Sequence, residues 1–407
     1  MTKTMLRVGL VGIGGYGEIY ARELLAKTGG DFVWVAGVDP QPQRSKLLDR
    51  LVQQKVEIFE SMEAMYARQE IDLCIISTPL HLHCDQTCFA LAHGSNVLCE
   101  KPMAVTPEQV QRMIAARDRA KKTLAIGFQW CYAPGIQALK RDILDGRFGA
   151  PLRLRTRTYW PRDEKYYTRS RWAGRQRDDS GQLVLDSPVN NACAHHLHSM
   201  LYLLGPTWNQ SDWPATVSAE LYRANTIENY DTAALRATTV KGTTVMFCVS
   251  HATQTLVDPT LLYEFEKGTV RYHAQVKASM VATFSDGSTR EYGVPPPGDD
   301  TTKLWAVMDA VRHGKPVACT AEAAGAHTAC MYAAQQSMPQ IATFPSDLIV
   351  TTGMPGSRST YVKGLEAVLD RCDQALKLPS ELGIPWGKPS RPICLSDGIS
   401  KPSSIDL

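Results

Sequence analysis

The feature that most constrains the fold of this chain is an apolar run that ends in a glycine-rich turn. Residues 6–11 lead into Gly12, Gly14 and Gly17, which have the spacing G-x-G-x-x-G, and residues 18–27 have the composition of a helix. In a strand–turn–helix unit such glycines allow a tight turn, a close approach of the backbone to a pyrophosphate, and packing of the helix against the strand. Since the helix N-terminus faces the negative charge, the stretch predicts a phosphate cradle.

A second apolar run supplies the context that a glycine pattern alone lacks. Residues 32–38 end in Asp39, which lies about 20 residues past the glycine turn. A carboxylate at this place accepts hydrogen bonds from a ribose 2′-OH and repels a 2′-phosphate, so Asp39 favours NAD. Arg44 follows a few residues later and keeps NADP open.

Apolar and helical segments alternate through residue 128, which predicts a doubly wound domain with a parallel sheet. We expect helices over 42–53, 61–68, 84–92 and 107–121, and strands over 56–59, 71–77, 96–99 and 124–128. Ligands bind outside the carboxyl ends of the strands in such sheets. The cofactor-binding residues that we expect at these ends are Gly12, Ile13, Gly14, Gly15, Tyr16, Gly17, Asp39, Arg44, Thr78, Pro79, His81, His83, Glu100 and Lys101.

These motifs together resemble the Gfo/Idh/MocA family, nicotinamide-dependent oxidoreductases related to glucose–fructose oxidoreductase and inositol 2-dehydrogenase. The most specific mark is Glu100-Lys101-Pro102 at the end of a strand, after the glycine turn, Asp39 and the segment 77–83. The resemblance covers residues 1–205 at least. It places Lys101 beside the nicotinamide and the substrate hydroxyl. An ammonium there also has a physical role, because it stabilises negative charge that develops on a carbonyl oxygen.

The strongest signal in the second half is an expected helix with two distinct faces. Ser187 suits the N-cap, Pro188 suits the first helical position, and Gly205-Pro206 ends the helix. The apolar stripe, which should be buried, consists of Val189, Cys193, Leu197, Met200 and Leu204. The opposite face, which should line a site, consists of Asn191, His195, His198 and Tyr202.

The family pattern on this helix is Asp-x-x-x-His, and two alignments fit it. One places Asn191 at the acid and His195 at the histidine, and the other places Asp186 at the acid and Asn190 at the histidine. The first keeps a side chain that can take a proton, because the unperturbed pKa of histidine is about 6.5. We therefore predict His195 as the general base, with Lys101 polarising the oxygen. Asn191 departs from the family because it cannot ionise, and Asp186 is expected to supply the missing charge.

Aromatic rings and guanidinium groups alternate through the segment 160–175. Rings pack against the C–H faces of sugars, and arginines bind hydroxyls or carboxylates. A structural loop with an aromatic plug explains the composition equally well. The substrate-binding residues that we predict are Tyr167, Arg169, Trp172, Asn190 and His198. The strand expected just before this segment, residues 152–160, has an arginine face that should be solvated, with phosphate binding as the alternative.

The rest of the chain reads as a sheet followed by helices. We expect strands over 217–224, 231–240, 243–251, 263–266, 270–273 and 281–284, and helices over 134–146, 303–313, 321–336 and 361–376. The predicted fold is α/β, with a Rossmann domain over 1–130 and an α+β substrate-binding and oligomerisation domain over 131–407. The second domain should have an open, mostly antiparallel sheet and a C-terminal extension from about residue 341. The family's sheets often pair face to face, so the resemblance implies a homodimer or homotetramer.

Composition excludes several classes of function. A net charge of +3 with mixed signs does not suggest nucleic-acid binding, and no apolar run is long enough to span a bilayer. The 11 cysteines form no C-x-x-C pair, and His195, His196 and His198 lack a carboxylate or thiol on their face, so we predict no metal. Residues 1–5 leave no room for a secretion signal, so we expect a cytoplasmic protein.

The function that these residues favour is an NAD(P)-dependent dehydrogenase acting on a sugar, cyclitol or related polyol. Two alternatives stay open at this point. One is a redox-assisted glycoside lyase or hydrolase that recycles NAD. The other is a non-catalytic regulator that senses nucleotides and sugars, against which the presence of both Lys101 and His195 argues. The sequence does not name the substrate.

Overall fold

The chain is described by a computed structural model that covers residues 5–27, 30–274, 279–297 and 300–395. The expectation for the start of the chain concerns residues 1–4, which lie outside this part. The chain divides into two compact units. The first comprises Met1–Ala104, Glu108–Tyr132 and Pro296–Ala324, and the second comprises Val105–Pro107, Ala133–Pro295 and Gly325–Leu407.

The first unit is built on a six-stranded parallel sheet with the order β3-β2-β1-β4-β5-β6. Its strands are β1 (Leu6–Val11), β2 (Phe32–Val38), β3 (Glu57–Phe59), β4 (Leu73–Ile76), β5 (Asn96–Cys99) and β6 (Leu124–Ile126). The central strand β4 is buried throughout, as a parallel sheet covered on both faces requires. The strand order reverses between β1 and β4, where nucleotides bind in such sheets. The predicted Rossmann fold is confirmed.

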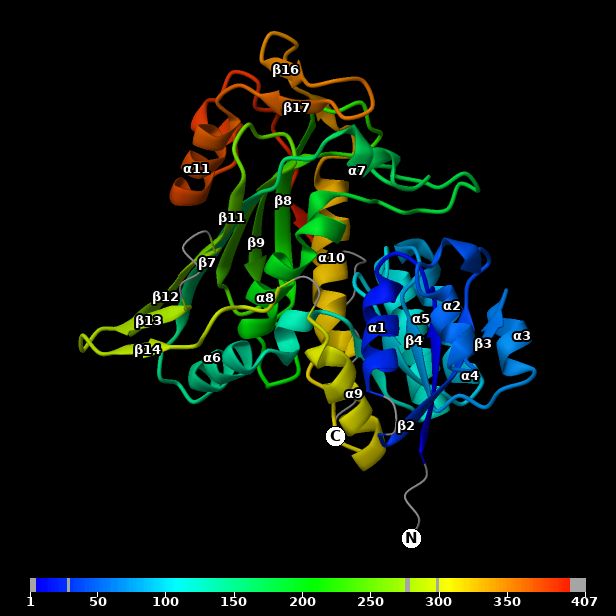
Figure 1. The fold of residues 1–407 in the computed structure, drawn as a ribbon. Helices are drawn as coiled ribbons and strands as arrows, with labels where there is room; N and C mark the ends of the chain where they lie inside the picture. Colours follow the sequence, from blue (N-terminus) through cyan, green and yellow to red (C-terminus); the bar gives the residue numbers. More distant parts are fainter. Residues whose placement is uncertain (1–4, 28–29, 275–278, 298–299, 396–407) are drawn as a thin grey trace. The chain divides into compact units, whose positions relative to one another are not determined.

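Helices and short turns connect these strands (Figure 1, blue and cyan). They are α1 (Gly17–Ala26), η1 (Pro42–Arg44), α2 (Leu48–Gln53), α3 (Met62–Tyr66), η2 (Leu80–Leu82), α4 (His83–Ala92), α5 (Pro107–Ala120) and η3 (Gln129–Tyr132). The prediction of one helix over 42–53 is wrong, because the backbone is extended at Ser45, with ψ 126°. The Ser45 hydroxyl accepts the N–H of Leu47 at 3.3 Å, a local bond that competes with the helix.

One helix reaches the first unit from much later in the sequence. Helix α9 (Thr302–His313) follows the strands of the second unit along the chain but belongs to the first (Figure 1, yellow). Its residues Lys303, Leu304 and Val307 are buried. Helix α10 (Ala321–Ser337) comes next, and all but its first turn belongs to the second unit.

The second unit contains a ten-stranded sheet with the order β14-β13-β12-β11-β7-β10-β9-β8-β15, and β18 also pairs with β8. Its strands are β7 (Pro151–Tyr159), β8 (Pro214–Arg223), β9 (Thr232–Thr239), β10 (Thr244–Ser250), β11 (Val257–Phe265), β12 (Gly268–His273), β13 (Val281–Phe284), β14 (Thr289–Glu291), β15 (Ala342–Thr343) and β18 (Ile393–Cys394). Strands β7 and β10 are parallel, as are β15 and β8, and the other pairs are antiparallel. The predicted mostly antiparallel sheet is confirmed.

Helix α8 lies against one face of this sheet, where it contacts β7, β10 and α6. The hydroxyl of Thr156 in β7 lies 3.3 Å from the sulfur of Met200 in α8. The remaining helical elements of the unit are α6 (Pro134–Leu144), α7 (Glu164–Thr168), η4 (Pro188–Ala192), α8 (Ala194–Leu203), α11 (Leu365–Ala375) and η6 (Ser380–Leu382). A hairpin of β16 (Ile349–Thr352) and β17 (Ser359–Val362) precedes α11.

On the other face of the sheet lies α11, which contacts β7 and β10. We call residues 342–395, which include α11, the C-terminal segment. Arg155 and Arg157 alternate with Thr156 along β7 and therefore point to this face. Arg155 pairs with Asp373 at 2.9 Å, and Arg157 pairs with Asp370. The prediction of a solvated arginine face is therefore wrong at these two positions, because the acidic side of α11 neutralises them.

An apolar cluster fills the space beneath α11. It consists of Tyr159, Tyr222, Ala234, Met246, Cys248, Phe344, Val362, Leu365, Leu369, Cys372 and Leu378. The predicted helix over 361–376 is wrong in its first turn, because residues 359–362 form β17. Gly364 has φ +72°, a left-handed conformation that separates the strand from α11.

Candidate functional site

The glycine turn after β1 has the geometry that a phosphate cradle requires. Gly12 has φ +84°, and a Cβ there would lie 2.6 Å from the carbonyl oxygen of Ser77. A Cβ on Gly17 would lie 1.9 Å from the carbonyl oxygen of Gly12. On Gly14, in contrast, a Cβ would meet only Asp39 Oδ2, at 3.8 Å, among the described residues. Two glycines therefore let the chain close on itself, and Gly14 leaves bare backbone where a pyrophosphate is expected.

Asp39 stands at the end of β2 with its carboxylate oriented by backbone donors. The N–H of Ile13 donates to Oδ2 at 3.3 Å, and the N–H of Gln41 donates to Oδ1 at 2.9 Å. The acid is thereby fixed to the glycine turn, as a ribose-binding carboxylate should be. Arg44 is exposed in η1. The choice between NAD and NADP stays a prediction that rests on Asp39.

A buried histidine joins the turn after β4 to the turn after β5. The ring nitrogens of His83 lie 2.7 Å from the carbonyl oxygen of Pro102 and 2.9 Å from that of Thr78. Burial lowers the pKa of His83. The ring thus holds two loop backbones together, which favours a positioning role over direct contact with a nucleotide. His81 lies half-buried in η2, which begins after Pro79.

The Glu100-Lys101-Pro102 turn rests on a buried carboxylate. The Tyr20 hydroxyl donates to Glu100 Oε1 at 2.5 Å, and the Lys303 ammonium lies 2.5 Å from the same oxygen. The other oxygen, Oε2, accepts the backbone N–H of Lys101 at 3.1 Å. A cis peptide bond joins Lys101 to Pro102. Glu100 therefore fixes the backbone from which the predicted catalytic lysine projects.

In the second unit, the predicted continuous helix over the histidine cluster is wrong. Residues 188–192 form the π-helical turn η4, Cys193 leaves the helical conformation with ψ 13°, and α8 begins at Ala194. The predicted N-cap is confirmed, because the Ser187 hydroxyl accepts the N–H of Asn190 at 3.1 Å. The break separates Asn191 from the regular helix that carries His195, so their predicted i, i+4 relation does not hold.

Burial separates the residues of this segment into two groups. The predicted apolar stripe is buried at every position. Asn191 and His195 are half-buried, whereas Asn190, His198 and Tyr202, which were expected to face a ligand, are buried as well. The ring of His198 stacks on that of Tyr202 at 5.9 Å. Burial lowers the pKa of His196 to about 3.

The side chain of Asp186 lies next to that of Asn191. Its side chain is buried, and Oδ1 accepts the amide N–H of Asn191 at 2.9 Å. The other oxygen, Oδ2, accepts the N–H of Gly174 at 2.7 Å and lies 3.5 Å from the Arg169 guanidinium. The acid therefore orients the amide that replaces an ionisable side chain.

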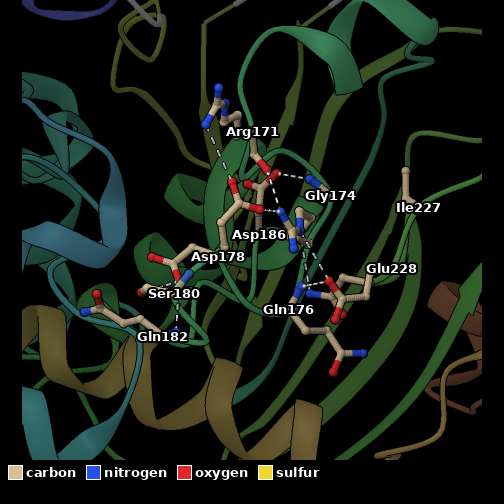
Figure 2. A network of polar contacts seen from close by, with 12 residues as sticks. Arg171, Gly174, Gln176, Asp178, Ser180, Gln182, Asp186, Ile227 and Glu228 are labelled. Carbon is tan, nitrogen blue, oxygen red and sulfur yellow. Dashed lines mark hydrogen bonds and ion pairs between the residues drawn. The ribbon is translucent and has the colours of Figure 1, made fainter.

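The segment after Arg171 folds back toward Asp186, as Figure 2 shows. The Gly174 N–H points at the Asp186 carboxylate, and the N–H of Gln176 donates to Glu228 at 3.2 Å. Asp178 accepts the N–H groups of Ser180 and Gln182, both at 2.9 Å. These backbone donors give the loop a defined conformation around the acid.

The aromatic and cationic side chains of residues 166–172 stack into one cluster. The Arg169 guanidinium carbon lies 3.7 Å from the centre of the Tyr166 ring and 5.2 Å from that of Trp172. The Tyr167 ring meets Tyr166 edge-on at 5.2 Å. Burial raises the pKa of Tyr167, so its hydroxyl stays protonated. Three predicted substrate-binding side chains therefore lie together beside Asp186, in a loop that also packs on itself.

Two groups near these sites were missed by the sequence analysis. One is Lys303. The sequence does contain a signal for its burial, because Lys303 falls on the apolar stripe of α9 with Val307 and Ala310. The other is His251, which is buried against the Tyr166 ring at 5.3 Å with no hydrogen-bond partner for its two ring nitrogens among the described residues. No sequence pattern marks His251, which follows an ordinary apolar strand.

No helix in the part of the chain that the structure describes is both long enough and apolar enough to cross a lipid bilayer. A Rossmann unit with a glycine turn and an acid after β2 is the arrangement by which such sheets bind a dinucleotide. Residues 6–128 match a family model described as an oxidoreductase family with an NAD-binding Rossmann fold. Over these residues the chain is similar to the Gfo/Idh/MocA family, and the match supports the predicted NAD cofactor.

Relatives with assigned names are similar over part of their length. An inositol 2-dehydrogenase of Burkholderia cenocepacia (strain HI2424) is 28% identical over 202 residues, which are 49% of this chain and 55% of that protein. The rhizopine catabolism protein MocA of Rhizobium meliloti is 32% identical over 146 residues, 36% of this chain and 44% of that protein. The chain thus spans about half the length of the curated relatives it matches.

Solved structures resemble the chain over most of its length. An oxidoreductase from Agrobacterium radiobacter, in complex with NAD+, L-tartaric acid and magnesium, has a TM-score of 0.67 at 20% identity and covers 83% of this chain and 97% of its own. The WlbA dehydrogenase from Bordetella pertussis, in complex with NADH and UDP-GlcNAcA, has a TM-score of 0.67 at 24% identity, with the same coverage. At these identities the similarity establishes the fold.

Proposed function

We propose that this protein is an NAD-dependent dehydrogenase of a sugar, cyclitol or related polyol. The observation that carries the proposal is the Glu100-Lys101-Pro102 turn, held by a buried carboxylate in an NAD-binding family fold. The inositol 2-dehydrogenase relatives and the dehydrogenase solved with UDP-GlcNAcA support the substrate class. The chain spans only about half the length of the matched relatives, so we propose the activity and the substrate class without carrying them over from those relatives.

Each unit contributes side chains with a defined chemical role. Bound NAD would accept or return the hydride at its nicotinamide. On the first unit, the Lys101 ammonium stabilises negative charge on the substrate oxygen. On the second, His195 takes the hydroxyl proton, since an imidazole titrates near neutral pH. Asn191, oriented by Asp186, donates to a substrate hydroxyl, and Arg169 with the neighbouring rings binds the ring face of the sugar.

The experiment that tests this proposal follows nucleotide absorbance with NAD+ or NADP+ against inositols, aldoses, uronates and glycosides, with products analysed in parallel. The first prediction is that one polyol class produces reduced nucleotide. His195→Ala should lower the rate by about 10²–10⁴-fold, the usual contribution of a general base. His313→Ala, an exposed histidine at the end of α9, is the matched control and should leave the rate unchanged.

Other outcomes would replace the proposal. A cleaved glycoside without accumulation of reduced nucleotide would indicate redox-assisted elimination with recycled NAD. Nucleotide binding without any product would indicate a sensor. The homodimer or homotetramer implied by the family resemblance and the cytoplasmic location stay predictions, and a light-scattering mass tests the first of them.

A further inference from the structure

A lysine from α9 is buried in the first unit with an acceptor for each of its protons. Lys303 is 1% exposed, and its ammonium lies 2.5 Å from Glu100 Oε1, 3.1 Å from the Tyr16 hydroxyl and 3.2 Å from the carbonyl oxygen of Gly127. An ammonium has three donors, so this one is fully satisfied. Burying a charge is expensive unless it is paired and hydrogen-bonded, as here.

These contacts join the two turns that the nucleotide site needs. Tyr16 belongs to the glycine turn, and Glu100 ends β5 and accepts the backbone N–H of Lys101. A chain of contacts therefore runs from the glycine turn through Lys303 and Glu100 to the backbone of Lys101. Gly127 leaves room for the Glu100 carboxylate, since a Cβ at residue 127 would lie 2.8 Å from Glu100 Oε1.

Lys303 is a cation in direct contact with the Glu100 carboxylate. Other titratable groups near this carboxylate include Tyr20, His83 and Cys99. Burial and the nearby carboxylate raise the pKa of Tyr20, and burial lowers that of His83, so both are neutral near pH 7. The thiol of Cys99 is also neutral, because burial raises its pKa.

We propose that Lys303 is a positioning residue of the nucleotide site. Its ammonium pairs with the buried Glu100 carboxylate and ties it to Tyr16, so that the glycine turn and the Lys101 turn hold one relative geometry. The inference rests on the proposed function only for the role of Lys101. Its effect on nucleotide affinity follows from the geometry of the first unit alone.

The test is Lys303→Met, which keeps most of the aliphatic stem and removes the charge. Calorimetric titration with NAD+ should show a Kd raised about tenfold or more at pH 8. The affinity should be lost because the variant leaves the buried Glu100 carboxylate without the cation that pairs with it. The Tm should also fall, because an uncompensated buried charge destabilises the fold.

Three further variants separate charge from packing. Lys303→Met combined with Glu100→Gln leaves no uncompensated charge and should regain most of the affinity for NAD+. Tyr16→Phe deletes one contact of Lys303 and should raise the Kd for NAD+ with little change in Tm. Lys315→Met, at an exposed lysine that pairs with Asp309 just after α9, is the matched control and should behave as wild type.

The proposal fails if Lys303→Met binds NAD+ as tightly as wild type, or if the double variant binds NAD+ no better than the single one. Either result would reduce Lys303 to a packing residue. If Lys303→Met does not fold, the NAD+ affinities of the double variant and of Tyr16→Phe still test the proposal. Absence of turnover in wild-type protein that binds NAD+ would contradict the proposed dehydrogenase and leave this inference standing.

Discussion

At the scale of single residues, the buried carboxylate of Asp186 contacts Asn191, the residue for which the family resemblance predicts an acid. Asn191 stands where the first alignment expects an acid, and a neutral amide cannot hold a negative charge. Asp186 precedes η4, yet its carboxylate accepts the Asn191 amide at 2.9 Å. Its partners on the loop side are Gly174 and Arg169. One buried acid thus orients groups from two segments.

The second prediction concerns this acid. Asp186→Asn keeps the shape of the side chain but leaves the Arg169 guanidinium without its anionic partner. We expect kcat/KM for the polyol substrate to fall on the order of 10- to 100-fold, because a displaced Asn191 misorients the substrate. Asp179→Asn is the matched control, since Asp179 is exposed and pairs with Arg175 in the same loop. Equal kinetics of the two variants would contradict the role given to Asp186.

At the scale of elements, caps were predictable from sequence and breaks were not. Ser187-Pro188 and Ser61 are local signals, and the structure has an N-cap at each serine. The break at Cys193 and the end of η1 at Ser45 involve neither glycine nor proline at the break itself. Local propensity does not reveal them, because tertiary packing and side-chain competition decide such positions.

The third prediction compares two caps. Ser187 is buried, accepts the Asn190 N–H and donates to the Tyr230 hydroxyl at 2.9 Å, so Ser187→Ala loses two hydrogen bonds. We expect the free energy of unfolding of the second unit to drop by about 2 kcal/mol. Ser61→Ala loses only the hydrogen bond from the Ala64 N–H, at 3.2 Å. It should lower the free energy of unfolding of the first unit by about 1 kcal/mol. Urea unfolding measures both, and a larger loss at Ser61 would contradict this account.

At the scale of the whole molecule, the chain's motifs were easier to predict than the contacts between distant segments. The Rossmann strands and the mixed sheet follow from apolar periodicity and turn signals that lie within short windows. The contact of Lys303 with Glu100 spans 203 residues, and that of Arg155 with Asp373 spans 218. Nothing in a local pattern specifies such partners, which is why Lys303 and the covered sheet face were missed.

The fourth prediction tests how strongly the C-terminal segment holds the second unit together. Leu369 is buried in the cluster under α11, so Leu369→Ala should lower the free energy of unfolding by about 2–4 kcal/mol. Leu144→Ala, at a 39% exposed leucine ending α6, should change it by less than about 0.5 kcal/mol. If urea unfolding gave similar losses of stability for the two variants, the packing of α11 against the sheet would contribute little to the stability of the second unit.

The covered face of the sheet also has a consequence for biosynthesis. A ribosome delivers strands β7 to β14 well before α11, because their residues come first in the chain. Until Leu365 and Leu369 emerge, side chains such as Met246 lack the cover that they have in the finished fold. Nascent chains with bare apolar surface are prone to association and are the usual clients of chaperones. Translation that stops before Leu365 would leave that face permanently uncovered, so a helix made late protects strands that were made before it.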